Sequence, residues 1–203
     1  MSLQDRPLSQ RNNEVKDSEV PKYVGKLKRF LGHEALVKAQ ADLDKDLTHH
    51  GLCYREWAQK LKPWLFAFRM YDQITRNGIH IPNSWPRKIR DMVGDALMIS
   101  SLHRGMPENV RAKYRKDLLL GQHNDFMVEI HAAWHYHLEG YDVQWHPLGH
   151  GKIPEFRVQG GGLDFDVECR RFDWDMSDHV KKSAIADTCD MIYDVILAHG
   201  LWG

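Results

Sequence analysis

The sequence predicts a mixed α/β fold, in which a helical N-terminal part precedes a smaller unit that contains three strands. Apolar residues recur every three or four positions through much of residues 22–120, which is the spacing of amphipathic helices. After residue 140, apolar and polar residues alternate instead, which is typical of strands. Three consecutive glycines, Gly160 to Gly162, favour a tight turn between two of these strands.

Four helical segments are expected in the N-terminal part. The first covers about residues 22–46, and Gly32 can interrupt it. The second covers about residues 54–76, and Pro63 can kink it. The third and fourth are expected at residues 87–102 and 108–119. Residues 1–21 are polar and lack periodicity, so we expect a disordered tail before a helical region of residues 22–120.

Residues 121–203 are expected to form a unit with the order helix, strand, strand, strand, helix. Asn124 or Asp125 can cap a helix that reaches Leu138. The three strands are expected at residues 141–146, 152–159 and 163–171. A last helix is expected at residues 177–199.

Composition limits the class of protein. With 203 residues, of which 42% are hydrophobic and 28% charged, the chain resembles ordinary globular proteins. No apolar run reaches the roughly 18 residues of a membrane span, and the first residues lack a signal-peptide core, so we expect a cytoplasmic protein without membrane contact. Cys53, Cys169 and Cys189 lack the paired spacing of zinc sites or disulfide frameworks, so we expect them to be reduced.

The net charge of zero hides an asymmetry along the chain. Residues 1–121 contain 22 Lys and Arg against 14 Asp and Glu, whereas residues 122–203 contain 6 against 14. The basic part could contact nucleic acid phosphates, and the acidic part could bind a cation; alternatively, the two parts merely attract each other or solvent. The basic stretches KLKR (residues 26–29) and RAKYRK (residues 111–116) are either DNA contacts or solvated helix faces.

Carboxylates are unusually frequent in the expected strands. In LDFDVECR (residues 163–170), period two places the apolar residues on one face and Asp164, Asp166, Glu168 and Arg170 on the other. A turn at Gly160 to Leu163 would place Glu155 opposite Glu168 on this polar face. Such a pair of like charges costs roughly 0.2–1 kcal/mol. A divalent cation would relieve the repulsion, unless the face is simply solvated and neutralised by Arg157, Arg170 and Arg171.

These residues resemble the motif of a known family. A helix with Glu129, a Pro154-Glu155 pair and the tripeptide Glu168-Cys169-Arg170 look like the PD-(D/E)XK nuclease superfamily, which is restriction-endonuclease-like. The resemblance implies an α-β-β-β-α-β core and a phosphodiesterase that depends on Mg²⁺ or Mn²⁺. It implies that Glu155 and Glu168 bind the metal with the backbone carbonyl of Cys169, that Glu129 assists, and that Arg170 occupies the position of the family lysine.

The sequence departs from the family pattern at three points. Glu155 stands where the family most often has Asp. Arg170 replaces Lys, and a guanidinium stays protonated, so it could hold the attacking hydroxide or stabilise phosphate charge but could not accept a proton. The last core strand is apparently missing, so the chain is a fragment, its fold is decayed, or a partner chain or second copy in a homodimer completes the sheet edge.

The resulting hypothesis is a divalent-metal-dependent nuclease that acts on DNA. Glu129, Glu155, Glu168 and Arg170 are the expected catalytic residues, and Arg157, Arg171, Lys181 and Lys182 are the expected nucleic-acid contacts. His146 beside this site is either a phosphate contact or an ordinary loop histidine. The alternatives are a catalytically inactive nuclease-fold module that binds nucleic acid or a protein partner, and a purely structural domain with surface acids.

Overall fold

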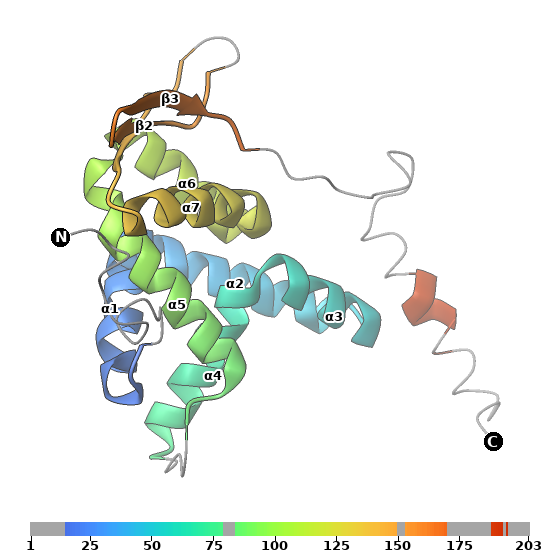
Figure 1. The fold of residues 1–203 in the computed structure, drawn as a ribbon. Coiled ribbons are helices and arrows are strands. Elements are labelled where there is room, and N and C mark those ends of the chain that lie inside the picture. The colour runs from blue at the N-terminus through green and yellow to red at the C-terminus, as the bar shows by residue number, and fades with distance from the viewer. Residues whose placement is uncertain (1–14, 79–83, 150–152, 170–187, 193, 195–203) are drawn as a thin grey trace.

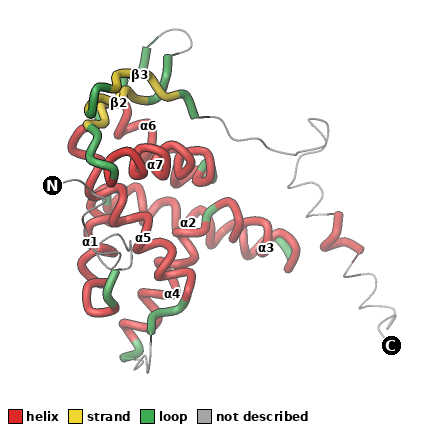
Figure 2. Tube along the Cα trace, viewed as in Figure 1, coloured by secondary structure: helices red, strands yellow, loops and turns green. Residues whose placement is uncertain are grey.

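The computed structural model describes residues 15–78, 84–149, 153–169, 188–192 and 194. The described chain is mostly helical, with one small antiparallel sheet above helices α6 and α7 (Figures 1 and 2). The helices are η3 (Asp17–Glu19), α1 (Val20–Leu31), α2 (His33–His49), α3 (Leu52–Leu61), α4 (Pro63–Arg76), α5 (Arg87–Leu102), η4 (His103–Gly105), α6 (Glu108–Leu120) and α7 (His123–Leu138). The strands are β1 (Asp142–Trp145), β2 (Phe156–Gly160) and β3 (Leu163–Val167).

The helices expected between residues 22 and 138 are present, and both expected interruptions are real breaks. Gly32 separates α1 from α2, and its φ of 87° lies where side chains other than glycine are strained. Pro63 begins α4 after α3 has ended, because proline is compatible with the first turn of a helix but not with its interior. Helical structure begins at Asp17, within residues 1–21, so the helical part starts earlier than expected.

Helix α5 lies at the centre of the helical part, where it packs against α1, α4 and α7. Its buried side chains recur at the spacing of a broad apolar face; they are Ile89, Met92, Val93, Ala96, Met98, Ile99 and Leu102. Burial of one large aliphatic side chain contributes about 1.5–3 kcal/mol. The α5 core therefore fixes the position of α7, which carries the sheet.

The three strands pair antiparallel in the order β1-β2-β3. Gly160 pairs with Leu163, and Gly161 and Gly162 between them have φ of 56° and 82°, so the expected glycine turn is confirmed. β3 ends at Val167, earlier than the expected 171. Of the helix expected at residues 177–199, residues 188–192 and 194 are helical, and the remainder lies outside the described residues.

The inner face of the sheet packs on α7. Phe156 and Val158 of β2 are fully buried, and the ring of Tyr136 in α7 lies 6.3 Å from that of Phe156 and 5.7 Å from that of Phe165. Trp145 of β1 contacts Tyr114 of α6 at 5.9 Å between ring centres. Aromatic packing therefore joins the sheet to both helices.

A C-terminal residue caps α3. The buried Asp190 carboxylate accepts hydrogen bonds from the backbone N–H groups of Cys53 (2.7 Å) and Tyr54 (3.1 Å), which lie in the first turn of α3. Gly51, at the N-cap position, has no side chain that could do so. Residues far apart in the sequence are thus joined at one helix terminus.

Within the described parts of the chain, we find no helix with the length and apolar character that a bilayer crossing requires.

The break at Gly32 gives a first prediction. An added Cβ at Gly25 or at Gly32 would have no heavy atom within 4 Å, apart from the excluded local neighbours, but only Gly32 has positive φ. We expect Gly32→Ala to lower the free energy of unfolding by about 1–3 kcal/mol through backbone strain. Gly25→Ala, inside α1, should raise it by about 0.5–1 kcal/mol. Urea unfolding of both variants measures the difference, and equal effects would contradict the assignment of the α1–α2 break to backbone conformation.

Candidate functional site

A small cavity of about 140 Å³ lies where α6, α7 and the segments between β1 and β2 meet. We call it the Glu129–Glu155 cavity, after the two carboxylates that line it. Its other described lining residues are Val110, Lys113, Tyr114, His146, Pro147, Leu148, Gly149, Ile153 and Pro154. It therefore brings together two of the acids that the sequence motif contains.

Glu129 projects from α7 and is half-buried. Its pKa is raised to about 6, chiefly by burial and also by the negative charge of Glu155, although a hydrogen bond from the Tyr114 hydroxyl and the charge of Lys113 act in the opposite direction. Burial and the neighbouring carboxylates also raise the pKa of Tyr114, so the phenol remains a hydrogen-bond donor at neutral pH. The Glu129 carboxylate is thus held in place and titrates close to neutrality.

Glu155 reaches this cavity because the strand alternation is interrupted. Its backbone N–H donates to the carbonyl of Val167 (3.0 Å), although Val167 is already paired with Phe156. Two successive residues therefore oppose one, as in a β-bulge, and the chain bends at Glu155. The expectation that Glu155 shares the outer face with Arg157 and lies across from Glu168 is therefore wrong.

The Glu155 carboxylate is fixed by the backbone that follows β3. Its Oε2 accepts a hydrogen bond from the N–H of Cys169 (2.7 Å). Burial, and to a lesser extent the charges of Glu155 and Glu129, raise the pKa of the Cys169 thiol to about 11. At neutral pH Cys169 is thus an uncharged thiol beside two carboxyl groups, and it adds no negative charge to the cavity.

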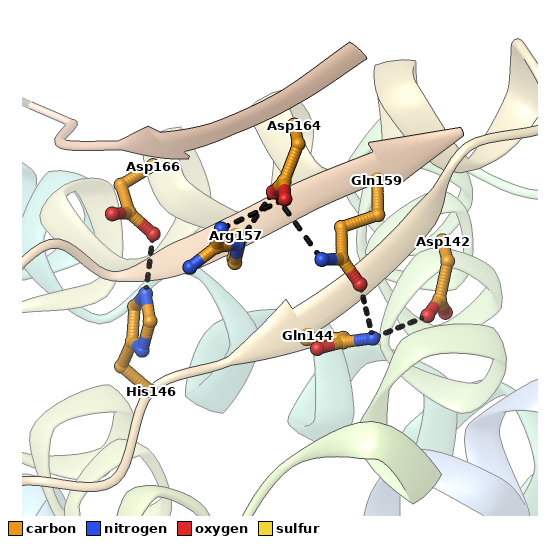
Figure 3. A network of polar contacts seen from close by, with 7 residues as sticks. All are labelled: Asp142, Gln144, His146, Arg157, Gln159, Asp164 and Asp166. Atoms are coloured by element: carbon orange, nitrogen blue, oxygen red, sulfur yellow. Dashed lines mark hydrogen bonds and ion pairs between the residues drawn. The ribbon is translucent and has the colours of Figure 1, made fainter. Parts of the chain in front are cut away.

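The outer face of the sheet carries a separate polar network, shown in Figure 3. Arg157 donates to both oxygens of Asp164 (2.5 and 2.8 Å), and His146 Nε2 lies 2.8 Å from Asp166. Gln159 and Gln144 extend these contacts across the three strands to Asp142. Asp164 and Asp166 therefore fit the simpler interpretation of a solvated strand face with paired charges. Arg157, an expected nucleic-acid contact, has a carboxylate partner in its own hairpin.

Of the remaining predicted site residues, the structure describes only Glu168. Glu168 is exposed, and it is not among the described residues that line the Glu129–Glu155 cavity. Arg170, Arg171, Lys181 and Lys182 lie outside the described residues. Within the described ranges, no group of three or more His, Cys, Asp or Glu residues is arranged to hold a metal ion.

Two carboxylates at one cavity still suit a hard divalent cation. Mg²⁺ commonly uses one or two carboxylates and completes its shell with water and phosphate oxygens. Glu129 and Glu155 provide such oxygens, and the charge of Glu155 raises the pKa of Glu129, which a cation between them would reverse. The donor set therefore fits Mg²⁺ or Mn²⁺ with two protein carboxylates.

Tyr114 and Lys113 were not expected at this site. The spacing of Val110, Tyr114 and Leu118, which are all buried on one side of α6, is the signal that could have placed Tyr114 inside. The basic letters around it, in RAKYRK, favoured a surface segment instead. His146, singled out as a loop residue beside the site, does line the cavity.

No protein-family model matches this chain, and neither the curated proteins nor the solved structures gave a match.

The elevated pKa of Glu129 gives a second prediction. The folded chain holds the Glu129 proton up to about pH 6, compared with an ordinary value of 4.5, so between these values the folded state binds more protons than the unfolded state. The free energy of unfolding should therefore fall as the pH rises through this window, by about 2 kcal/mol from this group. Glu129→Gln should lack this contribution in urea unfolding between pH 4 and pH 7.

Glu139→Gln is the control, because Glu139 is an exposed residue at the end of the same helix. It should leave the difference between pH 4 and pH 7 as in the original chain. An unchanged pH dependence in Glu129→Gln would show that this carboxyl group titrates normally.

Proposed function

We propose that the chain is a divergent member of the PD-(D/E)XK nuclease superfamily that hydrolyses phosphodiester bonds in DNA with Mg²⁺ or Mn²⁺. The observation that carries this proposal is the meeting of Glu129 from α7 and Glu155, the residue before β2, at one small cavity. The described order of one helix followed by three antiparallel strands supports it, since it agrees with the first four elements of the family core.

In this proposal the divalent ion supplies a more acidic water and positive charge beside the scissile phosphate. Glu129 and Glu155 would hold the ion. Tyr114 orients Glu129 through its hydroxyl, and the N–H of Cys169 orients Glu155. Because its pKa is about 6, Glu129 is mostly ionised at neutral pH and can therefore act as a ligand.

Cationic residues complete the proposed site. Lys113 lines the cavity, and its positive charge would attract the phosphate. Arg170 would add a second positive charge, as its position in the motif implies. Glu168, which is exposed, would contribute as a ligand only after its side chain turned toward the cavity. The site is thus proposed to work with two fixed carboxylates.

A second candidate is a nuclease-fold module without catalysis that binds nucleic acid or a protein partner. The favouring observation is that both cavity carboxylates already have protein donors, while the described residues provide no third carboxylate ligand. In this case Glu129 and Glu155 would stabilise the junction of α6, α7 and the sheet.

Cleavage of a fluorescent DNA duplex by the full chain with Mg²⁺ or Mn²⁺ separates these functions and forms a third prediction. We expect metal-dependent cleavage that Glu155→Gln slows by at least about 100-fold, since loss of a residue that only orients a metal ligand already costs about 10- to 100-fold. Glu155→Asp keeps the charge and matches the usual family residue, so it should retain activity.

Asp164→Asn is the matched control, because Asp164 is an exposed acid on the outer face of the same hairpin. It should cleave at the original rate. Cleavage that survives in Glu155→Gln would exclude this cavity as the active site. DNA binding without cleavage under any metal would support the non-catalytic module.

A further inference from the structure

A second cavity, of about 340 Å³, lies between α1, α5, η4 and α6. We call it the arginine cavity. Its charged lining residues are Lys26, Arg29, Arg104, Arg111 and Arg115, and His103 lies among them. Among the described residues that line it, none is Asp or Glu. Five positively charged side chains thus line one cavity in a chain whose net charge is zero.

Helical geometry brings the two basic stretches of the sequence together here. Lys26 and Arg29 are three residues apart on α1, and Arg111 and Arg115 are four residues apart on α6, so each pair lies on one helix face. The two stretches are far apart in the sequence but line the same cavity. Arg104, from η4, adds a fifth cation.

The protein itself neutralises little of this charge. Glu108 forms ion pairs with two of these residues, at 2.7 Å from Arg111 and 3.2 Å from Arg115. One carboxylate therefore neutralises part of the charge of both guanidinium groups. In the part of the chain that the structure describes, we find no ion pair for Lys26, Arg29 or Arg104. Cations crowded together in this way repel one another, and a bound anion would remove that cost.

Hydrogen bonding also points to a ligand. The Nε atoms of Arg111 and Arg115 are buried and have no acceptor among the described residues, whereas buried donors in proteins are nearly always paired. The Arg115 guanidinium lies 5.5 Å from the centre of the Phe30 ring, which restricts its position. His103 Nδ1 lies 3.1 Å from the carbonyls of Ile99 and Ser100, so it carries the hydrogen and Nε2 does not donate in the neutral ring.

We propose that the arginine cavity is a phosphate-binding site for a multiply charged phosphate ligand. Guanidinium groups match the geometry of phosphate oxygens, and an excess of cations over one carboxylate favours phosphate over a singly charged anion. The volume is within the range of small-ligand sites. The phosphate is that of a free pyrophosphate or nucleotide, or that of a nucleic acid strand. The site is separate from the Glu129–Glu155 cavity, and binding there does not require hydrolysis.

Binding to the full chain in EDTA tests this, because cleavage at the other cavity would then be suppressed. Titration calorimetry with pyrophosphate and fluorescence anisotropy with a 5′-phosphorylated oligonucleotide distinguish the two sources. We expect saturable binding of at least one of them. The double variant Arg29→Gln/Arg104→Gln, which changes two exposed residues, should weaken it by at least about tenfold, as expected for lost charge-assisted hydrogen bonds. For the oligonucleotide, the slope of the logarithm of the binding constant against the logarithm of the salt concentration should also decrease by about one to two, which corresponds to one to two lost phosphate contacts.

Arg87→Gln is the matched control, because it removes one positive charge from the exposed start of α5, outside the cavity. It should leave the affinity unchanged, and the thermal midpoints of all variants establish that they are folded. The second double variant, Arg111→Gln/Arg115→Gln, should also weaken binding. The proposal is overturned if neither ligand binds saturably, if Arg87→Gln weakens binding as much as the cavity variants, or if an acidic peptide binds more tightly than both phosphate ligands. If phosphate binding is retained and no DNA cleavage is found, the result contradicts the proposed nuclease activity of the Glu129–Glu155 cavity and supports the phosphate-binding site.

Discussion

Helix α5 contacts α1, α4 and α7 at once, and its buried side chains extend from Ile89 to Leu102. A helix that is covered on several sides can move only if its neighbours move too, since protein interiors are close-packed. The positions of α7 and of α1 therefore depend on this one helix. The geometry of both cavities depends on α5 as well, because α7 supplies Glu129 and α1 supplies Lys26 and Arg29.

Helix α6 contributes to both cavities, and it separates opposite charges. Tyr114 holds the carboxylate of Glu129, while Arg111 and Arg115 line the arginine cavity. A half-buried acid with a pKa near 6 costs stability at neutral pH, and an apolar residue at the same place would avoid that cost. Residues that violate the rules of stable packing in this way concentrate at functional sites. Helix α6 thus has a carboxylate pair on one side and a group of cations on the other, which is the arrangement that the two proposals require.

The sequence was sufficient for the elements that depend on periodicity or on a special backbone residue. The bounds of α5, the break at Gly32 and the turn at Gly160 to Gly162 could all be predicted in this way. The start of α7 could not, because the helix begins at His123 after Gln122 without a side-chain cap, instead of at Asn124 or Asp125. Glu155 could not be placed either, because a single irregular backbone hydrogen bond sends its side chain to the opposite face. The arginine cavity depends on how the tertiary structure places α1, α5, η4 and α6 around one space, for which local patterns carry no signal.

The capping of α3 by Asp190 has a consequence for synthesis of the chain. A ribosome makes proteins from the N-terminus, so α3 emerges long before the carboxylate that completes its first turn. Until then, the amide groups of Cys53 and Tyr54 must be satisfied by water. Shortening the chain before Asp190 would therefore leave these two amide groups without their carboxylate acceptor.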